Sequence, residues 1–355
     1  MILARISKRF APAPDSAGFS LDIEFEAQPG VTVLFGASGA GKTLTLDSIA
    51  GFSKPDAGRI LLDDKIVFDA AASVNLRPQD RHCGYVFQNY ALFPHMTVRQ
   101  NLAFAAEPQP RLERHRRVAE MMERFHLVDL AGRRPHELSG GQKQRCSIAR
   151  ALIGSPKVLL LDEPARGLDV SLRAELYTLI RALRADFRIP ILLVTHDLEE
   201  CFALGDTLLI YDSGRIIQSG PPQKALDRPA SSDVARLLGF GNVFDAEILA
   251  LDPGRNTSRI RARDREFYAT YFPGHLLGAR IALGVRSGDV RVHSAPGDNR
   301  MPAKLSRVVE QPRGVRLEFA DGLVADVSRY DYAQQRDNQE WYLELPPDAF
   351  RPIGK

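Results

Sequence analysis

The hydrophobic pattern of the first two thirds of the chain is that of buried strands alternating with helices. The continuous apolar runs at 158–161 (VLLL) and 189–194 (IPILLV) have the length of parallel strands that are covered on both faces. Residues 21–25 (LDIEF) alternate apolar and polar side chains, as a half-buried strand does. Residues 97–154 have helical spacing instead, so we expect a helical insertion there. These features predict an α/β fold.

The pattern changes after residue 240, where short strands are separated by turns that contain Pro–Gly, Gly–Asp and Asp–Gly pairs. The strands are expected within 243–251, 259–264, 265–271, 280–292, 303–328 and 341–345. Such closely spaced strands suggest a small β-barrel. We therefore predict an α/β domain over 1–240, with a helical subdomain at about 89–154, and a β-rich accessory or regulatory domain over 241–355.

Composition is that of a globular protein, with 44% hydrophobic and 26% charged residues among 355. The net charge of +3 is too small to indicate a nucleic-acid partner. The arginine-rich runs at 111–117 and 259–265 are interpreted as solvated faces. Composition therefore predicts no nucleic-acid binding.

Cysteine spacing and the terminal sequence indicate the compartment. Cys83, Cys146 and Cys201 lie far apart and form no C-x-x-C pair, which argues against a zinc site and a disulfide framework. The N-terminal sequence lacks the apolar core of a signal peptide, and no run approaches the roughly 18 apolar residues of a membrane span. We expect a cytosolic chain whose membrane role, if any, comes through a partner.

The most informative stretch is GASGAGKT at 36–43, which follows the apolar run 31–35 and matches G-x-x-x-x-G-K-[ST]. Its glycines let backbone amides approach a phosphate, and the following helix adds its positive N-terminal end. Lys42 is expected to reach the β- and γ-phosphates, and the Thr43 hydroxyl to bind Mg²⁺. The predicted nucleotide contacts are Gly36, Ala37, Ser38, Gly39, Ala40, Gly41, Lys42 and Thr43. The stretch predicts a nucleoside triphosphate with Mg²⁺.

Polar side chains at the ends of predicted strands supply candidate chemistry. Asp162 is placed to hold Mg²⁺ through water, and Glu163 to act as general base towards the attacking water. His196 follows another buried strand and is expected to touch the γ-phosphate. Gln88, at the end of the strand within 83–88, either ligates Mg²⁺ or orients water.

A second anion site is predicted at LSGGQKQR (138–145), where Ser139 is the expected N-cap of a helix. Earlier in the chain, Phe10 and Phe19 precede the phosphate-binding stretch. Each is open to two interpretations, a stacking surface for adenine or an ordinary core aromatic.

The ordered strings GASGAGKT, LSGGQKQR and VLLLDEP, together with Gln88, Asp169 and His196, resemble the ATPase subunits of ABC transporters. The resemblance covers residues 1 to about 240. It implies a P-loop NTPase (RecA-like) sheet with a helical insertion, and an OB-like all-β fold for the tail. It also implies ATP hydrolysis coupled to solute transport.

The resemblance further implies a homodimer in which two copies face each other head to tail with two ATP molecules between them. Ser139, Gly140, Gly141 and Gln142 of one copy would then complete the site built by the other. The sequence departs from the family pattern at Arg166, within ARGLD, and Arg166 is expected near the dimer interface.

Several features resemble importers rather than other members of the family. The chain has one ATPase unit, no fused membrane helices and a β-rich tail, and the segment VFDAAASVNLRPQDR (67–81) resembles molybdate importers most. Sulfate, ferric-ion, polyamine and sugar importers are the alternatives, and a non-transport ABC ATPase is a further one. The implied partners are membrane permease subunits, contacted near residues 88–98 at the cytoplasmic face of the membrane, and indirectly an extracytoplasmic solute-binding protein.

The tail leaves two interpretations open. The string GVRSGDVRV (284–292) is similar to one in the accessory domains of importer ATPases. Such a domain either binds an oxyanion or a regulator, or stabilises the dimer.

Overall fold

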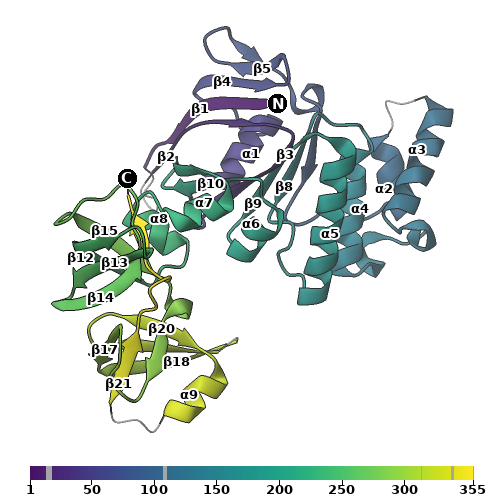
Figure 1. Cartoon of the computed structure of the whole chain (residues 1–355). Helices are drawn as coiled ribbons and strands as arrows, with labels where there is room; N and C mark the ends of the chain where they lie inside the picture. Colours follow the sequence, from purple (N-terminus) through teal and green to yellow (C-terminus); the bar gives the residue numbers. More distant parts are fainter. Residues whose placement is uncertain (13–17, 107–109, 313, 337–339, 355) are drawn as a thin grey trace. The chain divides into compact units, whose positions relative to one another are not determined.

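The computed structural model describes residues 1–12, 18–106, 110–312, 314–336 and 340–354. The chain forms two compact units, Met1–Pro222 and Gln223–Lys355 (Figure 1). The predicted boundary after residue 240 falls later than this division. The difference consists mainly of two short helices, α7 (Pro222–Asp227) and α8 (Ser232–Leu237).

The first unit is built on a six-stranded sheet with the order β11-β10-β3-β9-β8-β7. Five of these strands are parallel, and β11 pairs antiparallel with β10. The strands are β3 (Gly30–Gly36), β7 (Cys83–Val86), β8 (Val158–Asp162), β9 (Pro190–Thr195), β10 (Thr207–Asp212) and β11 (Arg215–Gly220). Every residue of β8 and β9 is buried, as their continuous apolar runs predict.

A second, antiparallel sheet has the order β2-β1-β4-β5-β6. Its strands are β1 (Ile2–Phe10), β2 (Phe19–Ala27), β4 (Ala57–Leu62), β5 (Lys65–Asp69) and β6 (Val74–Asn75). In β2 the buried and exposed residues alternate, which places one face on the core. Helix α1 (Lys42–Ala50) shares one buried cluster with strands of both sheets, so both sheets fix its position.

The predicted helical insertion contains α2 (Val98–Ala105), α3 (Arg111–Arg124) and α4 (Gly140–Leu152), with short 3-10 turns Val128–Leu130 and Pro135–Glu137 between α3 and α4. Helix α3 ends at Arg124. His126 then adopts a left-handed φ of 53°, which an α-helix does not tolerate. Val118, Met122, Phe125 and Leu127 are buried.

Two further helices follow β8 and β9. They are α5 (Val170–Phe187) and α6 (Leu198–Leu204), and α6 packs on β3 and β9. Asp169 is the N-cap of α5 and accepts a hydrogen bond from Leu172 N at 2.9 Å. Among the helices of the described ranges, none combines the length and the apolar character that a bilayer span requires.

The second unit is mainly antiparallel β-structure, which confirms the predicted all-β class of the tail. Its sheets have the orders β14-β13-β12-β15-β22, β16-β21-β17 and β18-β19-β20. The strands are β12 (Asn242–Asp252), β13 (Thr257–Ala262), β14 (Arg265–Thr270), β15 (Arg280–Val285), β16 (Arg291–His293), β17 (Arg300–Ala303), β18 (Leu305–Gln311), β19 (Gly314–Phe319), β20 (Val324–Val327), β21 (Trp341–Glu344) and β22 (Arg351–Ile353).

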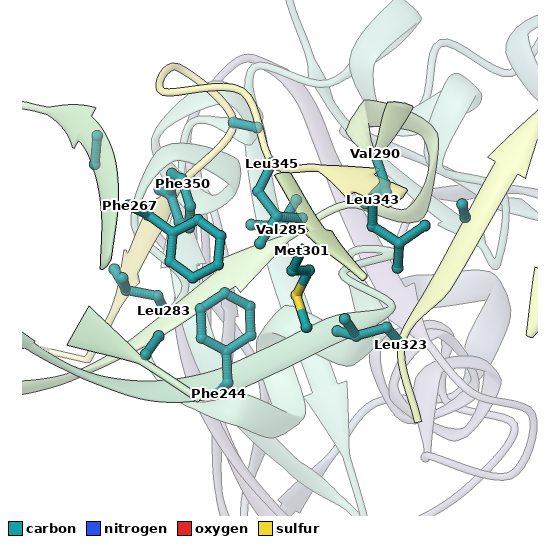
Figure 2. Packing of buried hydrophobic residues seen from close by; sticks show 14 of the residues in the cluster. Phe244, Phe267, Leu283, Val285, Val290, Met301, Leu323, Leu343, Leu345 and Phe350 are labelled. Atoms are coloured by element: carbon teal, nitrogen blue, oxygen red, sulfur yellow. The ribbon is translucent and has the colours of Figure 1, made fainter. Parts of the chain in front are cut away.

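One buried cluster joins these sheets (Figure 2). Phe244 and Phe350 meet edge to face with ring centroids 6.2 Å apart, and Phe267 lies 6.1 Å from Phe350. A 3-10 turn (Ser287–Asp289) begins at Ser287, within the segment 284–292 singled out from the sequence. Helix α9 (Arg329–Gln335) was not predicted, because its sequence RYDYAQQ has no apolar face. None of its residues is fully buried, and the partly buried Tyr332 packs against the cluster.

Candidate active site

The phosphate-binding stretch lies where β3 ends and α1 begins. Gly36 has a φ of 154°, and a Cβ there would lie 2.3 Å from the carbonyl oxygen of Tyr211. Gly41 has a φ of 101°, and its Cβ would lie 2.7 Å from Leu21 Cδ1. Both positions favour glycine for their conformation, and Gly36 also requires it for space, because a backbone carbonyl cannot give way as a side chain can.

Lys42 is enclosed by this stretch. Its Nζ donates hydrogen bonds of 2.8 Å to the carbonyl oxygens of Gly36 and Ala37, and only 5% of the residue is exposed. Burial lowers the pKa of Lys42, while Glu163 and Asp162 oppose that shift. The ammonium group is thus enclosed by the loop, with two neutral carbonyl oxygens as hydrogen-bond partners.

Thr43 and Asp162 come together as predicted. The Thr43 hydroxyl donates to Asp162 Oδ1 at 3.0 Å, and burial raises the pKa of Asp162. A hydroxyl oxygen beside a carboxylate suits a hard cation such as Mg²⁺. Within the described residues, no group of three or more His, Cys, Asp or Glu side chains is arranged so that it could hold a metal ion.

The Glu163 carboxylate is the meeting point of the other predicted residues. Its Oε2 accepts from Gln88 Nε2 at 3.0 Å, and its Oε1 lies 3.2 Å from His196 Nδ1. The backbone of Glu163 has a left-handed φ of 45°, and its N–H donates to Val194 O at 3.0 Å. The strand-end residues from β7, β8 and β9 thus gather around one carboxylate.

Arg166 also reaches this carboxylate, a contact that the sequence did not predict. Its Nη1 donates to Glu163 Oε2 at 3.1 Å. The string ARGLD shows that the sequence departs from the family pattern at Arg166, but it does not show which residue the arginine contacts. The contact itself depends on a turn in which Arg166 N donates to Glu163 O at 3.1 Å.

A cavity of about 410 Å³ brings these groups to one space. It is lined by Phe10, Phe19, Ser38, Gly39, Gly41, Lys42, Thr43, Leu44, Gln88, Asp162, Glu163, Arg166 and Val194. Both aromatic candidates for adenine stacking, Phe10 and Phe19, belong to the lining, and they are paired across β1 and β2. A neighbouring cavity of about 680 Å³ shares Phe19, Ser38 and Gly39. The space is large enough for a nucleotide.

The string 138–145 opens α4 as predicted. Ser139 Oγ accepts from Gln142 N at 3.3 Å, and Gln142 Oε1 accepts from Ser139 N at 3.0 Å, which forms a capping box. A Cβ on Gly141 would lie 2.8 Å from Leu172 Cδ2. Residues 139–142 are separate from the lining of the 410 Å³ cavity of their own chain.

The segment after Gln88 is attached to α4. Ser147 Oγ donates to Tyr90 O at 2.9 Å, and Arg150 Nη1 donates to Ala91 O at 2.7 Å. Tyr90 and Ala91 both have left-handed φ values, 63° and 48°. The helix that carries Ser139 and the loop that carries Gln88 are therefore hydrogen-bonded to each other.

Glu200 is a buried acid that the sequence analysis missed. It is 2% exposed, and its Oε1 has no hydrogen-bond partner within the described residues. Burial raises the pKa of Glu200 to about 7, with Asp197 adding to the shift and Arg173 opposing it. It lines a cavity of about 80 Å³ together with Glu163 and His196. Its position four residues after His196 was the available signal.

The glycine-rich loop, the enclosed Lys42 and the Asp162 carboxylate that accepts from the Thr43 hydroxyl together define a P-loop nucleoside triphosphatase. A family model described as ABC transporter matches residues 21–166. The chain belongs to the ATP-binding proteins of ABC transporters, and it is an ATPase of that family.

Three relatives illustrate the similarity. The molybdenum import ATP-binding protein of Rhodospirillum rubrum is 41% identical over 84% of this chain and 76% of its own length. The sulfate/thiosulfate import ATP-binding protein of Thermosynechococcus vestitus is 36% identical over 96% of this chain and 95% of its own length. The spermidine/putrescine import ATP-binding protein of Vibrio cholerae is 43% identical over 99% of this chain and 90% of its own length.

The fold agrees with that of a dimeric ATP-binding cassette solved in a post-hydrolysis state with ADP and Pi. That structure matches with a TM-score of 0.54 and 24% identity, over 62% of this chain and 99% of the other. The likeness covers the cassette and confirms its fold.

The raised pKa of Glu200 predicts a pH-dependent stability. Its folded pKa of about 7 exceeds the ordinary value of 4.5, so between these pH values the unfolded state loses the proton first and stability falls as pH rises. Glu200→Gln removes this titration. The free energy of unfolding of the Glu200→Gln variant minus that of wild type should therefore increase by up to about 3 kcal/mol from pH 5 to pH 8.

Urea unfolding of the full-length proteins at several pH values measures this difference. If glutamine packs imperfectly, it changes the free energy of unfolding by the same amount at every pH. This change therefore does not affect how the difference between variant and wild type varies with pH. A difference that stays the same from pH 5 to pH 8 would contradict the assignment.

Proposed function

We propose that this protein is the ATP-hydrolysing subunit of an ABC importer, bound peripherally at the cytoplasmic face of the inner or plasma membrane. The observation that carries this proposal is the Glu163 carboxylate. It lies beside the phosphate-binding loop, in contact with Gln88 Nε2 and near His196 Nδ1. A carboxylate held beside a triphosphate site is what in-line attack by water requires.

Lys42, Glu163 and His196 then have distinct roles. Lys42 exchanges the carbonyl oxygens of Gly36 and Ala37 for β- and γ-phosphate oxygens, which are stronger partners for an ammonium group. Glu163 accepts a proton from the attacking water, and His196 contacts the γ-phosphate.

Thr43 and Asp162, with Gln88, are the residues that would hold Mg²⁺. When bound, the ion neutralises charge on the β- and γ-phosphates. The adjacent hydroxyl and carboxylate oxygens of Thr43 and Asp162 support this assignment, since they lie 3.0 Å apart.

The functional form that we propose is a homodimer. Ser139, Gly140, Gly141 and Gln142 of one copy contact the ATP held by the other, through the Ser139 hydroxyl, backbone amides and the positive end of α4. Two observations support this arrangement: these residues lie outside the cavity lining of their own chain, and the solved cassettes with the same fold are dimeric.

The permease is proposed to bind near residues 88–98. A hollow of about 400 Å³ in this region is lined by His95, Met96, Gln100, Ala103, Phe104 and Arg114. Phe104 is 49% exposed. The hydrogen bonds from α4 to Tyr90 and Ala91 give this surface a direct connection to the helix that carries Ser139. Dimer closure would therefore move the proposed permease surface.

The proposed solute is molybdate or a similar oxyanion, and sulfate, ferric ion, polyamines and sugars are the alternatives. The string at 67–81 and the molybdenum-import relatives from two organisms support molybdate. The polyamine- and sulfate-import relatives match over more of the chain. The second unit is proposed as an accessory domain that stabilises the dimer, with anion or regulator binding as the alternative.

Ser139→Arg tests the head-to-tail arrangement. The arginine side chain should block dimer closure, while ATP binding to the single chain stays within about two-fold of wild type, since Ser139 lies outside that cavity. Equilibrium binding of a fluorescent ATP analogue and sedimentation with ATP measure the two properties. Loss of nucleotide binding in this variant would place Ser139 in its own chain's site and contradict the dimer model.

Cellular molybdenum tests the proposed solute. In cells that lack this chain, molybdenum measured by mass spectrometry at limiting molybdate should fall, and a wild-type copy should restore it. Lys42→Ala should fail to restore it, because the phosphates lose their enclosed cation. An unchanged molybdenum content would exclude molybdate and move the solute to one of the alternatives, with the ATPase assignment unaffected.

A further inference from the structure

The Glu163 carboxylate has three side-chain partners in this structure. Oε2 accepts from both Gln88 Nε2, at 3.0 Å, and Arg166 Nη1, at 3.1 Å, while Oε1 faces His196 Nδ1 at 3.2 Å. The Glu163 side chain is 15% exposed, whereas that of Arg166 is 61% exposed. A general base needs a carboxylate oxygen that is free to accept from water.

Two of these three partners have other roles in the proposed mechanism. Gln88 is assigned to Mg²⁺ and His196 to the γ-phosphate, so both are drawn towards the nucleotide when it binds. Arg166 has no such assignment. Its positive charge pairs directly with the carboxylate that must accept the proton.

The position of Arg166 suits a removable contact. Glu163 and Arg166 line both the 410 Å³ cavity and the 80 Å³ cavity that also contains Glu200. Arg166 is followed by Gly167, whose φ of 75° favours glycine. Because most of its side chain is already in solvent, the guanidinium can leave Glu163 without becoming desolvated.

We propose that Arg166 is a positioning residue that masks Glu163 while the ATPase is at rest. The ion pair occupies Oε2 and holds the carboxylate away from water, and turnover requires its release. This inference rests on the proposed role of Glu163 as general base, and it adds an internal brake on hydrolysis to that role.

The brake should be weak and sensitive to salt. Because the guanidinium side of the pair is mostly in solvent, the pair contributes little and its attraction is screened as ionic strength rises. If the pair holds most of the molecules in the masked form, its removal increases the accessible population by about two- to five-fold. The same increase should appear in the wild-type protein when salt weakens the pair.

The test compares kcat for ATP hydrolysis, at saturating ATP and without a permease, in wild type, Arg166→Ala and Arg166→Lys. Arg77→Ala is the matched control. Arg77 lies outside the site, and it forms an ion pair of the same (i,i+3) spacing with Asp80, in which Nε and Oδ2 are 3.0 Å apart. We expect Arg166→Ala to raise kcat about two- to five-fold and Arg77→Ala to leave it unchanged. Arg166→Lys, which keeps the charge, should lie between wild type and Arg166→Ala.

The salt dependence separates masking from a structural effect. Wild-type kcat should rise between roughly 50 and 300 mM salt relative to Arg166→Ala, so that the two proteins converge. A kcat that is unchanged or lowered in Arg166→Ala, or a ratio independent of salt, would overturn the proposal. Failure of the general-base assignment is recognised separately, because Glu163→Gln would then retain turnover.

Discussion

The parallel register of β3, β9, β8 and β7 is the constraint on which the active site depends. Phe35 pairs with Thr195, Asp162 with Val194, and Val86 with Leu161. The strands therefore end at the same edge, and the next residues along each strand are delivered to one place. A slip of one residue would turn each strand-end side chain to the opposite face of the sheet, so the site depends on this register.

This alignment places charged groups where water is scarce. Burial lowers the pKa of Lys42 and raises that of Asp162, so each group is held in a place that disfavours its charged form. The opposite charges nearby offset part of this cost. Groups of this kind gain most from a ligand that brings complementary charge, which a nucleotide with Mg²⁺ would do.

The strand ends could be predicted because a continuous apolar run identifies a buried strand and its carboxyl end. Gln88, Asp162, Glu163 and His196 were located in this way, and the structure gathers them at one cavity except for His196, which lines the adjoining one. Ser139 was predicted as an N-cap from its residue type and position, and the structure confirms it.

The remaining features depend on geometry that no local pattern records. The contact of Arg166 with Glu163 requires the left-handed φ of 45° at Glu163 and the turn that follows. The end of α3 at Arg124 depends on the left-handed His126. Helix α9 has no fully buried residue and packs against the buried cluster of its unit through the partly buried Tyr332, so its sequence shows no apolar face.

The most direct test of the central claim is ATP turnover and self-association of Glu163→Gln. Glutamine keeps the size of the side chain but cannot accept the proton, so turnover should fall by roughly 10²- to 10⁴-fold. Sedimentation with ATP and Mg²⁺ should then show a stable dimer, since bound ATP is no longer consumed. Near-normal turnover would contradict the assignment of Glu163 and the mechanism built on it.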